Sequence, residues 1–414
     1  MIRGRRYVYG IPVSSPPVSG MSIGTNFWHY TYYSGEEPMI PLEEIDWDTA
    51  YANGDNIWNP TWLEEVSIYS TFRFMNWAGT NNNAWGLDED WDNRRAVTSD
   101  TNHHSHIPSY IGFFNHGSNR PGLAYEWMID LCNRTNADMW MCVRHRSREY
   151  YWENLAHLLA ANLNPGLKVY IEYSNETWNG IFDQYDYVKD AGTDAGMPGS
   201  NEWYVGQSFH VHMSFELFEV FQDVFAQYGR SVDLVRVIAT GGNVDLLHRA
   251  LGGVSSSGSH YTTEELETIN PRGQWFDALA EAPYVGSGLD GASPTIYEDS
   301  QQGLLDQVTS TGRVTRARAR ADEYGVDLIA YEGGMHQLLN AREWAENPLV
   351  YDHYVTMFDT YKDYFDGPFC HYAHTSEWLN DSGRGAWGTM EYTGMPIDEA
   401  HKYRAIRDWV TDNV

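Results

Sequence analysis

Basic side chains and long apolar runs are both scarce in this sequence, and each shortage excludes a class of protein. The 27 lysines and arginines stand against 57 aspartates and glutamates, which gives a formal net charge of −30. Such a chain repels phosphate backbones, so we expect no binding of nucleic acid and little attraction to anionic membranes. No apolar run approaches the roughly 18 residues of a membrane-spanning helix. The charge also favours a neutral substrate over a polyanionic one.

Cysteine is scarce as well. Cys132, Cys142 and Cys370 allow one disulfide bridge at most, and no CxxC pair is present for metal or redox chemistry. Residues 1–20 begin with the basic MIRGRR but continue with glycine and proline in place of a clean apolar stretch. We interpret these residues as a leader or linker arm. They leave export open, and a secreted or extracellular location is our expectation.

Apolar and aromatic residues are plentiful instead. Hydrophobic residues make up 42% of the chain and aromatic residues 15%, which is too apolar for a disordered protein and enough for a large core. We therefore expect residues 21–414 to form one domain. Flat aromatic rings also pack against the C–H faces of sugars. Several of the 17 tryptophans fall in expected loops, namely Trp85, Trp91, Trp178, Trp203 and Trp387.

Short apolar or β-branched runs alternate with longer helical stretches along the chain. The expected strands are residues 22–28, 71–77, 138–145, 168–174, 234–240, 283–287, 327–331 and 368–374. The expected helices are residues 61–68, 123–135, 151–162, 202–228, 277–282, 301–324, 351–365 and 398–410. Eight such units predict an α/β fold, specifically a (β/α)8 TIM barrel with long βα loops. A doubly wound open sheet would alternate in the same way.

Two segments place a glutamate at the end of an expected strand. In KVYIEYSNETWNG, residues 168–180, Glu176 follows the fourth strand. In DLIAYEGGM, residues 327–335, Glu332 ends the seventh strand, and the following Gly333–Gly334 would let the backbone turn away. The fourth and seventh strands face each other across the mouth of a closed barrel. Two opposed carboxyl groups can cleave a glycosidic bond, one as a proton donor and one as a nucleophile or base.

This pattern resembles the clan A glycoside hydrolases, which are retaining (β/α)8 enzymes that include many cellulases, mannanases and xylanases. The resemblance rests on Asn-Glu at the end of strand four, Glu at the end of strand seven and Trp at the end of strand eight. It implies that Glu176 is the general acid/base and Glu332 the nucleophile. It also implies that Asn175 hydrogen-bonds the sugar 2-hydroxyl, and that Trp378 lies under the sugar at the cleavage point.

Further residues fit the same resemblance. Arg73 is similar to an arginine that supports the nucleophile, and His145 is similar to a sugar-contacting histidine at the end of strand three. Trp178 follows Glu176 closely and is a further candidate for sugar binding. One departure is that many clan members have a His or Tyr at the end of strand six, bonded to the nucleophile. Here that region has no histidine, and Tyr284 and Tyr297 stand at either side of it.

Structural interpretations of the same residues stay open. Glu176 could cap the following helix, and Glu332 could be the buried ion-pair partner of Arg73. His145 could be a core histidine. Trp178 and Trp378 could serve only in packing.

We therefore expect a retaining glycoside hydrolase that cleaves a β-linked neutral polysaccharide or oligosaccharide. Endo action is favoured, no cofactor or metal is required, and the oligomeric state is open. One alternative is a non-catalytic carbohydrate-binding barrel. Another is a metal-dependent hydrolase that uses the His-rich loop containing His103, His104 and His106.

Overall fold

The computed structural model describes residues 20–27, 47–81, 91–94, 97, 123–241, 245–255, 258–336, 339–380 and 385–413. Residues 1–19 of the expected leader lie outside these ranges, and so do Trp28, Trp85 and the three histidines of the HHSH loop. Among the described residues, no helix is long and apolar enough to cross a membrane.

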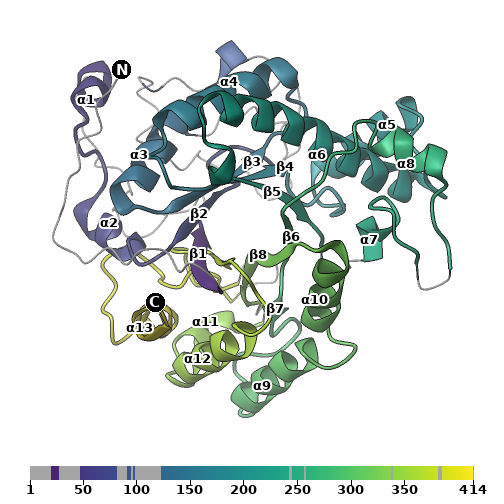
Figure 1. Cartoon of the computed structure of the whole chain (residues 1–414). Coiled ribbons are helices and arrows are strands. Elements are labelled where there is room, and N and C mark those ends of the chain that lie inside the picture. Colours follow the sequence, from purple (N-terminus) through teal and green to yellow (C-terminus); the bar gives the residue numbers. More distant parts are fainter. Residues whose placement is uncertain are drawn as a thin grey trace.

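Eight parallel strands close into a barrel (Figure 1). They are β1 (Ser22–Asn26), β2 (Thr71–Phe74), β3 (Asp138–Val143), β4 (Val169–Tyr173), β5 (Leu234–Ala239), β6 (Ala278–Glu281), β8 (Asp327–Met335) and β9 (Pro368–Tyr372). Barrel strands that follow one another in the chain are paired, and β6 pairs directly with β8. The last strand, β9, pairs with both β8 and β1, which closes the ring. The short β7 (Tyr284–Val285) adds only to the end of β8. The predicted TIM-barrel fold is confirmed.

Helices surround the ring of strands in Figure 1, and α5 and α8 extend away from it on one side. They are α1 (Trp47–Asn53), α2 (Pro60–Val66), α3 (Tyr125–Thr135), α4 (Glu149–Asn162), α5 (Asp183–Asp194), α6 (Glu202–Gln227), α7 (Asp245–His248), α8 (Thr263–Ile269), α9 (Ile296–Gln307), α10 (Arg313–Tyr324), α11 (Ala341–Ala345), α12 (Leu349–Tyr361) and α13 (His401–Asn413). Two 3-10 turns, Trp91–Asn93 and Ser231–Asp233, are also present.

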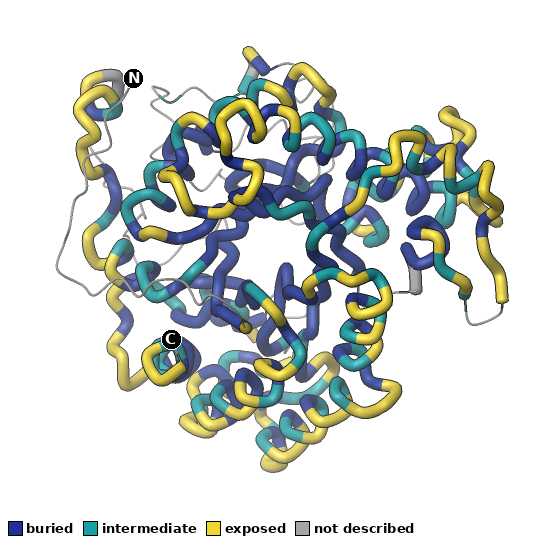
Figure 2. Tube along the Cα trace, in the orientation of Figure 1, coloured by how far each residue is buried: buried dark blue, intermediate teal, exposed yellow. Residues whose placement is uncertain are grey.

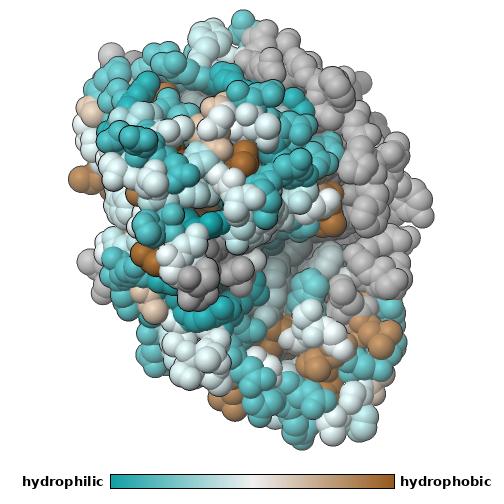
Figure 3. Space-filling model, turned by 90° about the vertical axis from the view of Figure 1, so that its right-hand side faces the viewer, coloured by the Kyte–Doolittle hydropathy of each residue, from teal (hydrophilic) through white to brown (hydrophobic). Residues whose placement is uncertain are grey.

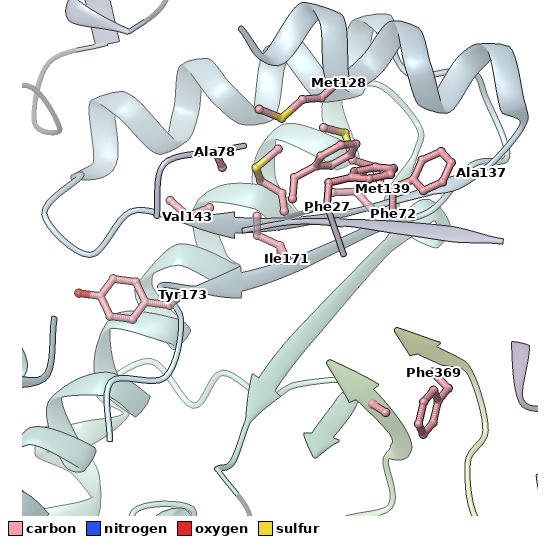
Figure 4. Close-up of a cluster of buried hydrophobic side chains, with 14 of the residues drawn as sticks. Phe27, Phe72, Ala78, Met128, Ala137, Met139, Val143, Ile171, Tyr173 and Phe369 are labelled. Atoms are coloured by element: carbon pink, nitrogen blue, oxygen red, sulfur yellow. The ribbon is translucent and has the colours of Figure 1, made fainter. Parts of the chain in front are cut away.

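Alternation along each strand divides the core into two layers. In β3, Met139 and Met141 face outward to the helices, whereas Trp140 and Cys142 face into the barrel. Figure 4 shows the outer layer, with Met128 of α3 packed near the outward side chains of the strands. Both faces of each strand are thereby removed from water, as in other parallel sheets. Figure 2 accordingly shows the ring as a continuous buried band inside a partly exposed shell.

The sixth strand lies earlier than the sequence predicted. The barrel strand is β6, Ala278–Glu281, within the segment that was expected to be a helix, and residues 283–287 contain only the two-residue β7. Ala-Leu-Ala-Glu has high helix propensity, which weakly opposes the strand. Pairing with both β5 and β8 overrides that preference.

Two further predictions were wrong in detail. The single helix expected over residues 301–324 is divided into α9 and α10, and Gly312 precedes α10 in an extended conformation. The chain also does not turn away at Gly333–Gly334, because β8 continues to Met335. A Cβ at Gly333 would lie 2.4 Å from the ring of Phe369, so glycine is needed there for the close approach of β9.

The outer surface is mostly polar. The face drawn in Figure 3 is largely hydrophilic, with smaller separate groups of hydrophobic residues. This distribution fits the excess of acidic over basic side chains in the sequence. All three cysteines are buried and unpaired, so the structure has no disulfide bridge.

Adjacent leucines of α9 provide a test of the outer layer. Leu304 is 0% exposed and Leu305 is 55% exposed. We expect Leu304→Ala to lower the free energy of unfolding by about 2–5 kcal/mol, because it leaves a cavity between helix and barrel. Leu305→Ala is the matched control and should change it by less than about 0.5 kcal/mol. Denaturant unfolding of both variants measures this, and equal effects would show that α9 is not packed as described.

Candidate active site

The candidate site lies at the carboxyl ends of the barrel strands. Glu176 stands three residues beyond the end of β4, and Glu332 lies within β8. The backbone that carries Glu176 is unusual, since Ser174 has φ 62° and Glu176 has φ 40°, both left-handed without being glycine. Such conformations cost free energy and are often found at functional sites. Here these backbone conformations place Asn175 and Glu176 at the mouth of the barrel.

Two donors hold the Glu176 carboxyl group. The hydroxyl of Tyr331 donates a hydrogen bond to its Oε1 at 2.8 Å. The side-chain amide of Asn179 donates to its Oε2 at 2.8 Å. The residue remains half-buried and so is accessible from the mouth. The Oε2–Asn179 bond is local, whereas the Oε1–Tyr331 bond crosses from the β4 loop to β8.

Glu332 is more deeply buried, at 7% exposure. Nη1 of Arg73 donates to its Oε1 at 3.1 Å, and the hydroxyl of Tyr284 donates to its Oε2 at 2.9 Å. Tyr284 follows β6, the sixth barrel strand, in the chain. Its hydrogen bond to Glu332 is the contact that the family resemblance implied for a His or Tyr near strand six. The misplaced sixth strand had concealed this correspondence.

Arg73 on β2 joins several elements below the site. Its guanidinium donates to both carboxyl oxygens of Glu172 on β4, at distances of 3.0 to 3.1 Å. It also donates to the side-chain oxygens of Asn26 and Asn175, at 3.3 and 2.8 Å. Arg73 is 0% exposed, so its contacts are with these side chains inside the barrel. It positions Glu332 and Asn175 from beneath.

The charges at the mouth interact strongly. Burial and the nearby negative charge of Glu176 raise the pKa of Glu332 to about 8. The positive charge of Arg73 and the hydrogen bond from Tyr284 oppose this rise. Glu332 therefore retains a proton at a pH at which an exposed glutamate is ionised.

Asn175 is packed from three sides and is 1% exposed. Besides the bond from Arg73, its side-chain amide donates to Asn81 at 3.0 Å, and its backbone carbonyl accepts from Gln184 at 2.7 Å. Its amide nitrogen carries two hydrogens. One hydrogen bond to Asn81 leaves a second hydrogen for another acceptor.

Aromatic residues border the pair on two sides. Trp178 packs edge-on against Tyr331, with ring centroids 6.2 Å apart. A Cβ at Gly241, two residues beyond the end of β5, would lie 1.6 Å from Nε1 of Trp178, so this position must be glycine for the indole to fit. On another side, Trp387 contacts the rings of Tyr372 and His336, at 5.8 and 6.1 Å.

Two of the expected sugar-binding residues are buried away from the mouth. Trp378 is 1% exposed, its indole nitrogen donates to the carbonyl of Gly388 at 3.0 Å, and Lys402 lies over its ring. His145 is 0% exposed and packs against Tyr187 of α5. Neither side chain presents a surface to a ligand in this structure. Their burial is what the packing interpretation of both residues expects.

Sequence reasoning missed several residues of the site. Tyr331 precedes Glu332, and strand alternation predicts that adjacent residues face opposite sides. Tyr372 ends β9, and burial, followed by the negative charges of Glu332 and Glu176, raises the pKa of its hydroxyl. Glu172 lies within the VYIEY segment of β4, all five residues of which are buried. The sequence signal that could have identified Glu172 is its position as a glutamate inside a strand that is otherwise apolar or aromatic.

The alternative of a metal-dependent hydrolase requires a cluster of metal-binding side chains. No group of three metal-binding side chains occurs within the described ranges, while the HHSH loop lies outside them.

Two of the tryptophans that the sequence placed in loops lie in helical segments. Trp91 is buried against Tyr125 and Tyr151. Trp203 is half-buried on α6 beside Tyr204.

Comparison with known proteins gives similarity of structure only. No protein family matches the sequence, and no curated protein matches it either. A β-glycosidase from Thermosphaera aggregans has 13% identity and a TM-score of 0.46, covering 96% of this chain and 97% of its own. A β-glucosidase from Thermotoga maritima has 11% identity and a TM-score of 0.47, with coverages of 95% and 93%.

An endo-β-1,4-mannanase from Cellulomonas fimi has 12% identity and a TM-score of 0.44, with coverages of 95% and 71%. These identities and scores are low. The assignment of the barrel therefore rests on the strand pairing described above, and the assignment of the site rests on its own contacts.

The raised pKa of Glu332 predicts a change of stability with pH. Its usual pKa is 4.5 and its folded pKa is about 8, so between these values the folded protein holds a proton that the unfolded chain releases. The contribution of this carboxyl group to stability therefore falls as pH rises through that window. The free energy of unfolding of Glu332→Gln minus that of the parent should therefore rise by up to about 1.4 kcal/mol for each pH unit in this window.

Denaturant unfolding at several pH values between 4.5 and 8 measures this difference. Glu267→Gln, at an exposed position on α8, is the matched control and should follow the parent at every pH. A constant difference between Glu332→Gln and the parent across the window would contradict the raised pKa.

Proposed function

We propose that the protein is a retaining glycoside hydrolase of the clan A type, which cleaves a β-linked neutral polysaccharide or oligosaccharide. The observation that carries the proposal is that two glutamates, Glu176 and Glu332, stand at the carboxyl ends of opposite strands of a closed (β/α)8 barrel. Each carboxyl group is held by donors from other parts of the barrel. Active sites of this fold lie at this end of the strands.

Glu332 is suited to act as the nucleophile. The hydrogen bonds from Arg73 and Tyr284 fix both of its oxygens and favour its ionised form. In the free protein, burial and Glu176 oppose ionisation. Positive charge that develops on the sugar ring beside Glu332 would stabilise its carboxylate, so the proton on Glu332 would pass to Glu176 as the substrate reacts.

The two chemical steps then follow. Glu332 attacks the anomeric carbon while Glu176 gives its proton to the leaving oxygen, which breaks the glycosidic bond and forms a glycosyl-enzyme. Water next attacks the same carbon, Glu176 takes its proton, and the bond to Glu332 breaks. Two inversions at one carbon retain its configuration. The chemistry requires no cofactor.

The surroundings of the pair support a neutral sugar. Arg73, which contacts Glu332, is fully buried and paired with Glu172, and so does not reach a substrate anion. Trp387, which is half-buried and packs against Tyr372, offers an aromatic surface on one side. Trp178 offers a second aromatic surface beyond Glu176. Aromatic surfaces on two sides favour binding of several sugar units and endo action, which in turn suits an extracellular location.

Labelling tests the nucleophile. A 2-fluoro β-glycoside with a good leaving group should inactivate the protein and add the mass of one fluorosugar to the peptide that contains Glu332, because the fluorine slows the second step. Glu332→Gln should lower kcat by at least about 10³-fold and remain unlabelled. Glu267→Gln, at an exposed position, should behave as the parent. Label on another peptide would refute the assignment of Glu332, and a parent without glycosidase activity would favour a binding barrel.

Leaving-group dependence tests the acid. Glu176→Ala should lose about 10³-fold or more in kcat/KM on substrates whose leaving group needs protonation, and much less on dinitrophenyl β-glycosides. Added azide should raise kcat of this variant and yield a β-glycosyl azide, because a small anion can replace the missing base. Product analysis by NMR gives the configuration. An α-azide, or equal losses on both substrate types, would exclude Glu176 as the acid/base.

A further inference from the structure

Tyr331 connects the two carboxyl groups of the candidate site. It directly precedes Glu332 in β8, yet its hydroxyl donates to Oε1 of Glu176, on the loop after β4, at 2.8 Å. Its side chain is buried at 1% exposure and belongs to the inner layer of the barrel. Two consecutive residues of one strand thus both serve the mouth of the barrel.

An irregularity of β8 explains how this is achieved. Ala330 is the register partner of Phe369, and Gly333 is the partner of His371, so three steps along β8 match two steps along β9. The extra residue is a β-bulge, which interrupts the alternation of side chains. Tyr331 and Glu332 both turn inward as a result, while Gly333 and Gly334 pass close to outward side chains of β9.

The tyrosine ring is held on two sides. The guanidinium carbon of Arg73 lies 5.0 Å from the ring centroid, within the range of a cation–π contact. The indole of Trp178 packs edge-on, at an interplanar angle of 66°. These contacts leave the hydroxyl little freedom, so it marks a defined position for Oε1 of Glu176.

The donor set around Glu176 favours one charge state. The amide of Asn179 donates to Oε2 while Tyr331 donates to Oε1, so the ionised carboxylate accepts both bonds without rearrangement. A proton on Oε2 would oppose the amide, which can only donate. A proton on Oε1 would require the tyrosine hydroxyl to reverse its direction. Hydrogen bonds to the charged form favour that form.

We propose that Tyr331 is a positioning residue that holds Glu176 and favours its ionised state, and thereby assists the second half of the reaction. The inference rests on the proposed function and deepens it. In that half Glu176 must be a base: water attacks the anomeric carbon, its proton passes to Glu176, and the bond from that carbon to Glu332 breaks. Loss of the tyrosine hydroxyl should slow this step more than the first.

Tyr331→Phe keeps the ring and removes the hydroxyl. On a dinitrophenyl β-glycoside, whose leaving group needs little protonation, we expect kcat and KM to fall together by about tenfold and kcat/KM to change little. This pattern reflects accumulation of the glycosyl-enzyme, which mass spectrometry of the quenched reaction should detect. The acid limb of the kcat profile should also move to higher pH, because Glu176 would bind its proton more tightly.

Tyr173→Phe is the matched control. Tyr173 is a buried tyrosine of β4 whose hydroxyl donates at 2.8 Å to the backbone carbonyl of His145, outside the site. This variant loses one buried hydrogen bond, as Tyr331→Phe does, and should keep the kinetic constants and pH profile of the parent. Two results for Tyr331→Phe would contradict the inference: a fall in kcat/KM equal to that in kcat, or an unshifted acid limb. Either would show that Tyr331 has only a structural role.

A measurement without substrate separates this inference from the proposed function. NMR titration of protein labelled with ¹³C at the glutamate carboxyl groups should show the Glu176 signal titrating at higher pH in Tyr331→Phe than in the parent. Glu176→Gln assigns the signal. An unchanged titration overturns the inference even if the parent is an active glycosidase. A parent that forms no glycosyl-enzyme overturns the proposed function, and the role in the second step with it, even where the titration shifts.

Discussion

The buried guanidinium of Arg73 is the constraint on which the candidate site depends. A cation that is fully removed from water must be paired, and here the carboxyl groups of Glu172 and Glu332 both accept hydrogen bonds from it. Removing one partner of such a network leaves an unpaired buried charge, which typically costs about 3–5 kcal/mol. Because these residues lie on β2, β4 and β8, the arginine ties three strands to one arrangement. The position of Glu332 therefore follows from the electrostatics of the barrel interior.

Local departures from regular geometry place the remaining groups. Left-handed residues at Ser174 and Glu176 carry the Glu176 carboxyl group above β4, and a bulge in β8 turns Glu332 inward beside Tyr331. Gly333 allows this bulge to pass Phe369 closely. The rigid ring of strands sustains these conformations, because the surrounding pairing overdetermines the backbone. Regular structure supplies the frame, and its irregularities orient the candidate catalytic side chains.

Much of the fold could be predicted from the sequence because most strands are short apolar or β-branched runs between clear helical stretches. Segments such as Asp138–Val143 are apolar on both faces, which identifies buried parallel strands. The segment Ala278–Glu281 could not be identified in this way, since alanine favours helices and gives no alternation. Of the site, the two glutamates and Arg73 could be singled out, while Trp378 and His145 could not be separated from core residues.

The sequence by itself determined the eight alternating units, the strong negative charge and the position of two glutamates near strand ends. These are local properties, set by composition and by spacing along the chain. Only the tertiary structure decided which partners those glutamates have, because contacts of Glu332 with Arg73 and of Glu176 with Tyr331 join residues that are 259 and 155 positions apart. It also decided which tryptophans are covered. Exposure and hydrogen-bond partners depend on how distant segments pack, and no local pattern encodes that packing.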